Sequence, residues 1–269
     1  MIRLVASDID GTLLPYGETE ISAEIFDLIR RLERRGILFC PASGRQYTSA
    51  RRLFAPVADR VPFLCENGAV VFGPGSPGPV LGKTPMDRAQ AEGACRHILS
   101  LPGVEVLISG EDTSYLCPKE AEIVEVMEGK GNNLTLIPRP EETPEDIVKL
   151  AAYCPGKLEE TFRALSGRWG EIFQVAIAGE CWVDLTLADK GSGLAQLCAA
   201  LGIAPEEVMA FGDNFNDVPM LEWAGRPCLM ENAAPALRAR FPVQCRRVAE
   251  VLEEIASSGP DADPADGGA

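Results

Sequence analysis

Asp8-Ile9-Asp10-Gly11-Thr12 directly follows a short run, residues 2–7, that has strand character and contains no turn residue. The two acids therefore stand where a buried strand ends, and Gly11 lets the backbone turn there. In an open parallel sheet, ligands bind outside the carboxyl ends of the strands. This stretch predicts an α/β fold with a functional site immediately after its first strand.

The spacing of Asp8 and Asp10 indicates a cation site. Side chains two residues apart face the same way along a strand, and two carboxylates held this close repel each other unless a cation or a proton intervenes. A divalent metal with one protonatable acid would relieve that repulsion. An ordinary turn also explains the pattern, whereas an EF-hand calcium loop would need a carboxylate where the chain has Thr19.

The composition is that of a globular chain with room for one large or two modest domains. It has 269 residues, of which 46% are hydrophobic and 24% are charged. A net charge of −15 creates no field that attracts phosphate backbones, so we expect no nucleic-acid partner. Apolar runs are too short for a membrane span or a signal peptide, so we expect no membrane partner and a cytoplasmic location.

The nine cysteines favour a reducing compartment, because their number is odd and no Cys-x-x-Cys pair occurs. Most have the character of small core residues. The chain has a single histidine, His97, so a zinc-binding spacing cannot be built. His97 falls in a predicted helix and is not a catalytic candidate.

Strand and helix alternate in the two outer parts of the chain. Short apolar strands separated by helices are typical of a parallel sheet covered on both faces. We therefore predict a Rossmann-like, doubly wound parallel sheet core from residues 1–83 and 188–256. Its predicted strands are 2–7, 37–40, 62–65, 208–211 and 226–230, and its predicted helices are 22–35, 46–54, 191–201, 214–223 and 246–256.

The block at 84–187 orders its elements differently and is predicted to be an inserted α+β cap domain. A Gly- and Pro-rich stretch, 73–79, precedes it, and we interpret this stretch as a hairpin turn between short strands at 69–72 and 80–83. Residues 257–269 are predicted to be a disordered tail. Inside the block we predict helices near 86–99, 119–128 and 143–153, and strands near 104–109, 113–117, 171–177 and 181–187.

Three more polar motifs fall at strand ends or helix starts. Ser43-Gly44-Arg45 follows the second strand, where a hydroxyl and backbone N–H groups can hold an anion. Lys190 stands where a helix begins, and its ammonium opposes the helix dipole unless it faces an anion. Asp213 and Asp217 share one face if a helix begins at the first of them. Each motif has a plainer alternative: a Ser-Gly turn, a surface lysine and an N-capping aspartate.

Together these motifs resemble those of the haloacid dehalogenase (HAD) superfamily, and within it the Cof-type phosphatases with a large α/β cap. Their order and spacing match over nearly the whole chain. The departures are small: Ser43 stands where threonine is common, and Ala188-Asp189 precedes the lysine. The matching residues are Asp8-Ile9-Asp10-Gly11-Thr12, Ser43-Gly44-Arg45, Lys190-Gly191 and Gly212-Asp213-Asn214-Phe215-Asn216-Asp217-Val218-Pro219-Met220.

The resemblance implies a Mg²⁺-dependent phosphomonoester hydrolase that acts on a small phosphorylated metabolite, such as a sugar phosphate, through an aspartyl-phosphate. Asp8 would be the nucleophile, Asp10 the general acid and base, and Lys190 a third catalytic residue that stabilises the transferred group. The implied phosphate contacts are Thr12, Ser43, Gly44, Lys190 and Asn216. The implied metal residues are Asp8, Asp10 through its backbone carbonyl, Asp213, and Asp217 through a bound water or Lys190.

By the same resemblance, the inserted block would be a lid that excludes water and selects the substrate. Arg139, Arg163 and Arg168 are candidates for reaching a second anionic group. Two alternatives remain open: a phosphomutase similar to phosphomannomutase, in which the phosphate returns to a second hydroxyl, and a HAD-like binding protein without turnover. The sequence leaves the substrate and the oligomeric state open.

Overall fold

The computed structural model describes residues 1–120 and 122–258, and the chain divides into two compact units. The core unit comprises Met1–Ser43, Ala50–Gly82 and the chain from Asp189 on, and the insert unit comprises Gly44–Ser49 and Lys83–Ala188. The domain boundaries predicted at 83/84 and 187/188 lie one residue from this division, which also assigns Gly44–Ser49 to the insert unit. Except for its first two residues, the predicted tail lies outside the described part of the chain.

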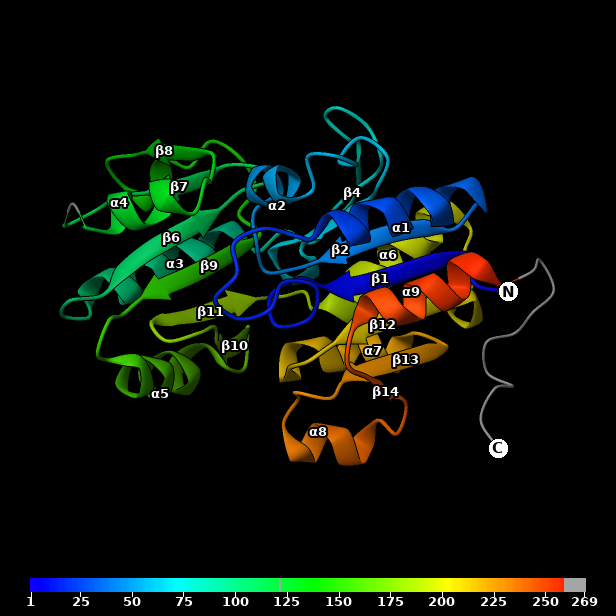
Figure 1. Ribbon diagram of the computed structural model, residues 1–269. Coiled ribbons are helices and arrows are strands. Elements are labelled where there is room, and N and C mark those ends of the chain that lie inside the picture. Colours follow the sequence, from blue (N-terminus) through cyan, green and yellow to red (C-terminus); the bar gives the residue numbers. More distant parts are fainter. Residues whose placement is uncertain (121, 259–269) are drawn as a thin grey trace. The chain divides into compact units, whose positions relative to one another are not determined.

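An eight-stranded sheet forms the centre of the core unit (Figure 1). Its strands are β1 (Leu4–Asp8), β2 (Leu38–Ala42), β3 (Phe63–Cys65), β4 (Val70–Phe72), β5 (Val80–Lys83), β12 (Val208–Gly212), β13 (Arg226–Met230) and β14 (Gln244–Cys245). They are ordered β14-β13-β12-β1-β2-β3-β4-β5, and all neighbours from β14 to β3 are parallel. The predicted doubly wound sheet is confirmed, and β4, antiparallel to β3, leads into the predicted hairpin with β5.

The order of strands reverses between β1 and β12. The chain runs outward from β1 through β2 and β3 on one side, and from β12 through β13 and β14 on the other. β1 and β12 are neighbours in register, with Ser7 opposite Phe211. The residues that follow these two strands therefore meet at one edge of the sheet, which is the place where doubly wound folds bind ligands.

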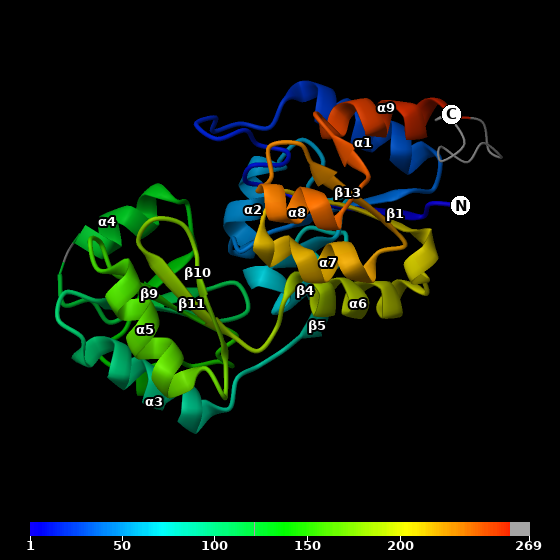
Figure 2. The same cartoon turned by 90° about the horizontal axis from the view of Figure 1, so that it is seen from below.

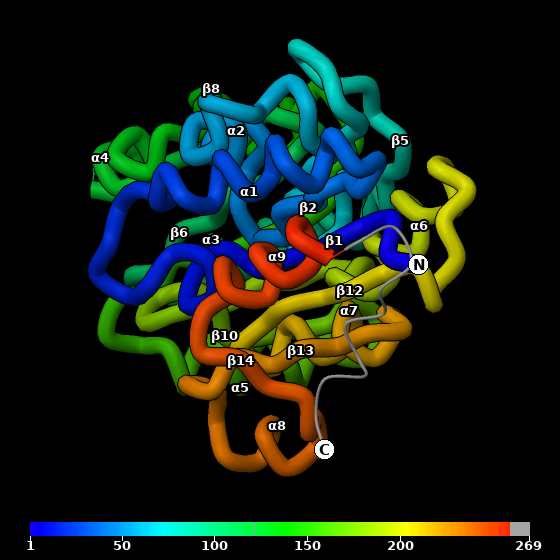
Figure 3. The backbone as a smooth tube through the Cα atoms, turned by 45° about the vertical axis from the view of Figure 1, so that its right-hand side comes forward, coloured from blue at the N-terminus to red at the C-terminus, as the bar shows by residue number. Residues whose placement is uncertain are grey.

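Helices cover both faces of the core sheet. They are α1 (Ala23–Arg34), α2 (Tyr47–Leu53), α6 (Lys190–Leu201), α7 (Val218–Trp223), α8 (Pro235–Arg240) and α9 (Val248–Ser257), with 3₁₀ turns η1 (Glu66–Gly68), η3 (Pro205–Glu207) and η4 (Phe215–Asp217). Figures 2 and 3 show α1 beside α9, and Figure 2 shows α6 beside α7 on the other side of the sheet. Helix α8 and strand β14 were not predicted from the sequence.

Strand alternation decides which way the first acid points. Leu4 and Ala6 belong to the apolar cluster that contains Leu194 and Leu197 of α6. Asp8 continues the same alternation and so points towards the side of the sheet that α6 covers. On the opposite side, α1 buries one apolar face, and its Phe26 packs edge-on against Phe54.

The insert unit contains a six-stranded sheet of order β10-β11-β9-β6-β7-β8. Its strands are β6 (Glu105–Ser109), β7 (Ser114–Leu116), β8 (Leu134–Leu136), β9 (Lys149–Tyr153), β10 (Gln174–Ile177) and β11 (Trp182–Thr186). Its helices are α3 (Arg88–Ser100), α4 (Glu122–Gly129) and α5 (Leu158–Trp169), with a 3₁₀ turn η2 (Pro140–Glu142). Residues of α3 and α5 share one apolar cluster, and residues of α4 belong to a second one.

The helix predicted near 143–153 is wrong, because this part of the chain contains strand β9. β9 pairs with β11 on one side and β6 on the other, and all five of its residues are buried. Its two faces contribute to different apolar clusters, Leu150 and Ala152 to one and Ala151 and Tyr153 to the other. Its sequence therefore shows no alternation and looks like a buried helix. Strand β8 and helix α5 were also not predicted from the sequence. Among the described residues, no helix has the length and apolarity to cross a bilayer.

Candidate active site

Asp8 is the last residue of β1 and is almost completely buried, at 6% exposure. Its Oδ1 accepts a hydrogen bond from Lys190 Nζ at 2.5 Å. Its Oδ2 is buried and accepts a hydrogen bond from no described residue. Burial raises the pKa of Asp8 to about 7, and the positive charge of Lys190 only partly offsets that rise. One carboxylate oxygen is thus held in place by Lys190, while the other has no hydrogen-bond partner among residues 1–120 and 122–258.

Lys190 is the first residue of α6 and is 1% exposed. The N-terminus of the helix is held by a capping box in which the Asp189 carboxylate accepts the Ser192 N–H at 2.7 Å. Lys190 Nζ donates to Asp8 and, at 2.6 Å, to Asp217 Oδ1. Burial by itself would lower the pKa of Lys190, but the two carboxylates raise it overall. The ammonium of Lys190 therefore lies between two carboxylates.

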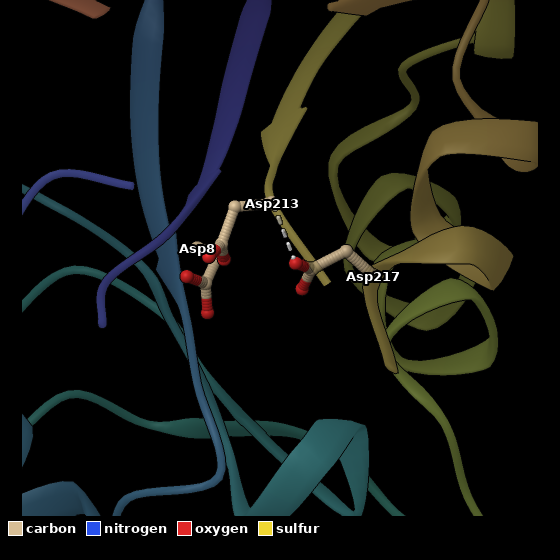
Figure 4. A group of neighbouring side chains, drawn as sticks. All are labelled: Asp8, Asp213 and Asp217. Carbon is tan, nitrogen blue, oxygen red and sulfur yellow. Dashed lines mark hydrogen bonds between the residues drawn. The ribbon is translucent and has the colours of Figure 1, made fainter. Parts of the chain in front are cut away.

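Asp217 is the last residue of η4 and is fully buried. Its Oδ2 accepts the backbone N–H groups of Asp213 and Asn214, both at 3.0 Å, and Figure 4 shows its carboxylate turned back towards Asp213. The helix predicted at 214–223 consists of the 3₁₀ turn η4 followed by α7 from Val218, so no helix begins at Asp213. The two acids come together because the Asp217 side chain closes the turn after β12, not because they share a helix face.

Gly212 makes this close turn possible. A Cβ at this position would lie 2.5 Å from the Cβ of Asp217, which is closer than two side chains can approach. The absence of a side chain lets the backbone after β12 pass directly beside Asp217. The glycine of the Gly212-Asp213 motif is therefore a packing requirement of the site.

Asp213 follows β12, and both of its carboxylate oxygens accept hydroxyl donors. Thr12 Oγ1 donates to Oδ1 at 3.3 Å, and the Tyr16 hydroxyl donates to Oδ2 at 3.1 Å. Burial, together with the negative charge of Asp217, raises the pKa of Asp213. Thr12, predicted to bind phosphate, contacts the carboxylate of Asp213 in this structure.

The site has a donor set that fits a hard divalent cation. Asp8, Asp213 and Asp217 offer carboxylate oxygens that lie within 4.8 Å of one another (Figure 4). Carboxylate oxygens are ligands that Mg²⁺ prefers. The buried Oδ2 of Asp8, to which no residue of the described part of the chain donates a hydrogen bond, is the feature that a cation would satisfy. The residues present therefore fit Mg²⁺.

The other predicted residues lie in different surroundings. The Asp10 side chain is exposed, and because β1 ends at Asp8, strand alternation does not extend to it. Asn216 is also exposed, within η4. Ser43 is buried directly after β2, where its N–H donates to Leu64 O at 2.9 Å. Gly44 lies in the insert unit, and its carbonyl accepts Lys149 Nζ at 2.9 Å.

Two contacts of the site were not predicted from the sequence. Besides the hydroxyl of Tyr16 on Asp213, the amide of Asn232 donates to Gly11 O at 3.1 Å. Neither residue belongs to a motif with a regular spacing. The only available signal for Tyr16 was a hydroxyl-bearing side chain shortly after the acidic stretch.

The arginines chosen from the sequence of the insert make local contacts within their own unit. Arg139 pairs with Glu142 at 3.1 Å, Arg163 donates to the carbonyl of Glu159, and Arg168 lies over the ring of Trp169. These contacts are those of surface side chains and give no sign of a shared anion site.

A buried polar group on the insert sheet was not anticipated. Lys149 Nζ lies 3.8 Å from Asp184 Oδ2, and both side chains are buried. Ser109, opposite Lys149 in the register of β6 and β9, has a buried hydroxyl that bonds to no described residue. We call Ser109, Lys149 and Asp184 the insert polar group. A buried hydroxyl without a partner is costly unless a ligand or water satisfies it.

Comparison with known proteins extends over both units. A family profile described as haloacid dehalogenase-like hydrolase matches residues 5–250. The chain is 29% identical over 242 residues to the 5-amino-6-(5-phospho-D-ribitylamino)uracil phosphatase YbjI of Escherichia coli, covering 88% of each chain. It is 30% identical over 249 residues to the HMP-PP phosphatase of Citrobacter koseri, covering 90% of this chain and 89% of that protein. A solved structure from Eubacterium rectale is similar with a TM-score of 0.84 at 30% identity, covering 94% of this chain and 99% of the other.

Proposed function

This chain belongs to the haloacid dehalogenase-like hydrolase family, and from that membership we propose that it is a Mg²⁺-dependent phosphomonoester hydrolase that works through an aspartyl-phosphate on Asp8. The family predicted from the motifs is confirmed, and the chain is an enzyme of a superfamily in which the relatives described above are named phosphatases. The observation that supports the proposal most is the buried chain of contacts from Asp8 through Lys190 to Asp217, with Asp213 beside it.

Asp8 is proposed to be the nucleophile. One of its oxygens attacks phosphorus while the bond from phosphorus to the leaving oxygen breaks, so that the phosphoryl group moves to Asp8. Lys190 holds the other side of the carboxylate and places a positive charge next to the reacting group. Because this ammonium is anchored on Asp217, it needs little rearrangement when charge develops.

A metal ion is proposed to bind at Asp8 and Asp213, with the Asp10 backbone carbonyl as a further oxygen. Mg²⁺ bound there would supply positive charge to offset the repulsion between a carboxylate and a phosphate dianion. Asp217 is proposed to act through Lys190, since its Oδ1 accepts the buried ammonium and its Oδ2 accepts two backbone N–H groups. This role differs from direct metal ligation and matches the arrangement of its donors.

Asp10 is proposed to be the general acid and base. It gives its proton to the leaving oxygen in the first step, and in the second step it takes a proton from the water that attacks the phosphoryl group on Asp8. That attack breaks the bond between Asp8 and phosphorus and releases inorganic phosphate. Thr12, Ser43, Gly44 and Asn216 are proposed to contribute polar contacts to the phosphate.

The insert unit is proposed to act as a lid and to select the substrate, a small phosphorylated metabolite. One of the two curated relatives is named for a substrate that joins a phosphorylated ribityl chain to a uracil ring. The insert polar group places an ammonium, a carboxylate and a hydroxyl together, which suits a hydroxyl-rich group that both donates and accepts hydrogen bonds.

Phosphate release from a panel of metabolites tests the proposed reaction. The panel contains sugar phosphates, phosphorylated polyols and phosphorylated heteroaromatic compounds, each with Mg²⁺ and with EDTA. We expect Mg²⁺-dependent release from at least one class and none from Asp8→Asn. Equal release by both proteins would contradict the role of Asp8, and isomerisation of a hexose phosphate without released phosphate would indicate a mutase.

The Lys149→Ala variant tests the proposed role of the insert polar group. We expect kcat/KM for the best hydroxylated substrate to fall at least tenfold, while kcat/KM for a small aryl phosphate without hydroxyl groups changes little. Arg163→Ala, which alters an exposed side chain of the same unit, is the matched control. An equal loss for both substrates would argue against a role in selection.

A further inference from the structure

We propose that Tyr16 is a positioning residue that holds the Asp213 carboxylate in the orientation needed to bind a divalent ion. This inference rests on the proposed function, because it assumes that Asp213 is a metal ligand. Tyr16 lies outside the four sequence motifs, and its role follows from its contact with a buried carboxylate.

Two hydroxyl groups from the loop after β1 donate hydrogen bonds to the two oxygens of Asp213. Thr12 Oγ1 reaches Oδ1 at 3.3 Å, and the Tyr16 hydroxyl reaches Oδ2 at 3.1 Å. With a donor on each oxygen, rotation of the carboxylate about its last bond would break at least one hydrogen bond. This loop begins directly after Asp8, the last residue of β1. The two hydrogen bonds therefore fix the orientation of the Asp213 carboxylate relative to the strand that carries Asp8.

Backbone hydrogen bonds hold the first part of this loop, residues 9–14. Ile9 O accepts the N–H groups of Leu13 and Leu14, and the Gly11 N–H donates to Leu14 O at 2.8 Å. Gly11 has φ +94, and a Cβ there would lie 2.3 Å from Asp213 Oδ2 and 2.8 Å from the Tyr16 hydroxyl. The hydrogen bond between Tyr16 and Asp213 therefore lies so close to residue 11 that only glycine leaves enough space there.

The exposure of Tyr16 separates positioning from packing. The residue is 73% exposed, although its hydroxyl bonds to a buried carboxylate. The ring thus contributes little to the core, and Tyr16→Phe removes one hydrogen bond without opening a cavity. Groups that hydrogen-bond to metal ligands commonly change metal affinity by about 10–100-fold when they are removed.

Calorimetric titration of the full chain with Mg²⁺, without substrate, tests the inference. We expect Tyr16→Phe to raise the Kd for Mg²⁺ about tenfold, while its thermal unfolding midpoint without metal stays that of the unmodified protein. In phosphate-release assays, the Mg²⁺ concentration for half-maximal rate should rise by a similar factor. An unchanged Kd in Tyr16→Phe would overturn the inference.

Two tyrosines of the insert unit provide matched controls. The Tyr153 hydroxyl donates to Glu122 at 2.9 Å and the Tyr115 hydroxyl to Glu145 at 2.6 Å, so each also bonds to a carboxylate. Tyr153→Phe and Tyr115→Phe should leave the Kd for Mg²⁺ unchanged. If either raised it as much as Tyr16→Phe, the effect would be general and the positioning role would be wrong.

Asp213→Asn distinguishes the failure of this inference from the failure of the proposed function. Loss of Mg²⁺ binding in Asp213→Asn, together with normal binding in Tyr16→Phe, would refute positioning by Tyr16 and leave the metal site intact. Unchanged binding in Asp213→Asn would refute Asp213 as a ligand, and with it both this inference and the proposed metal site.

Discussion

Lys190 shows how much of the site depends on one side chain. Its ammonium lies between two buried carboxylates, those of Asp8 and Asp217, and is itself 1% exposed. Taking three charged groups out of water is costly, and their mutual attraction offsets that cost only while all three are present. The same lysine therefore stabilises the fold of the site and, by our proposal, the charge that develops during phosphoryl transfer.

Replacement of Lys190 by methionine is expected to destabilise the protein by about 3–5 kcal/mol, because it leaves two carboxylates buried without their shared cation. The free energy of unfolding from denaturant titration measures this loss, and phosphate release should become undetectable. Arg240→Ala is the control, since Arg240 and Glu222 form a pair in which both side chains are 51% exposed. An exposed pair contributes about 0–1 kcal/mol, so a similar loss in both variants would contradict the prediction.

Gly212 is expected to tolerate no side chain. In Gly212→Ala the new Cβ would collide with Asp217, so the carboxylate that anchors Lys190 must move. Misplacement of a catalytic group by about 1 Å can lower a rate about 100-fold, and we expect kcat to fall on that order. Gly167→Ala is the control, because its Cβ would meet no atom within 4 Å in α5. A normal kcat in Gly212→Ala would contradict the prediction that a side chain at this position displaces the carboxylate of Asp217.

At the scale of elements, strands and helices differ in how they place functional groups. β1 and β12 bring Asp8 and Asp213 to one edge because the two strands are parallel neighbours in register. α6 contributes Lys190, its first residue. The turn through η4 contributes Asp217, whose carboxylate accepts the backbone N–H of Asp213. The site is therefore built from the ends of four elements, each fixed by hydrogen bonds of its own backbone.

The packing of α3 against α5 has a titratable contact. Trp169 Nε1 donates to His97 Nδ1 at 3.0 Å, and burial, followed by the charge of Arg168, lowers the pKa of His97. Protonation would turn the acceptor Nδ1 into a donor and break this hydrogen bond. Because the folded pKa is lowered, this contribution to stability is present above the unfolded value of about 6.5 and is lost as the pH falls through the folded value.

Proton NMR can follow this group directly, since His97 is the single histidine of the chain. We expect its imidazole resonances to titrate below pH 6.5, the value of an unperturbed histidine. In Trp169→Phe the midpoint should rise, because the hydrogen bond to the neutral ring is gone. A midpoint at or above the unperturbed value in the unmodified protein would show that this contact does not favour the neutral form.

At the scale of the whole molecule, the net charge of −15 opposes the binding of an anionic substrate. The core unit concentrates part of that negative charge in a buried cluster of three carboxylates. A divalent cation there would lower the repulsion inside the folded protein. Since an unfolded chain does not hold this cluster together, metal binding should stabilise the folded state.

Mg²⁺ is expected to raise the thermal unfolding midpoint. At a free concentration of about 100 times Kd, binding to the folded state alone adds about 2.7 kcal/mol. Scanning calorimetry with Mg²⁺ and with EDTA measures the shift, which should disappear in Asp213→Asn. An equal shift in that variant would place the binding of the ion elsewhere on the chain.

The sequence by itself determined the family, the doubly wound core and the residues that gather at its edge. It could do so because strand and helix periodicities and the acidic motifs are local patterns, and parallel strands bring their carboxyl ends to a common edge. Only the tertiary structure decided that Lys190 bridges Asp8 and Asp217, that Tyr16 bonds to Asp213, and that β9 is a strand. These outcomes depend on partners distant in the chain. Hydrogen bonds between such residues leave no periodic signal, and a segment buried on both sides takes its conformation from the neighbours that pair with it.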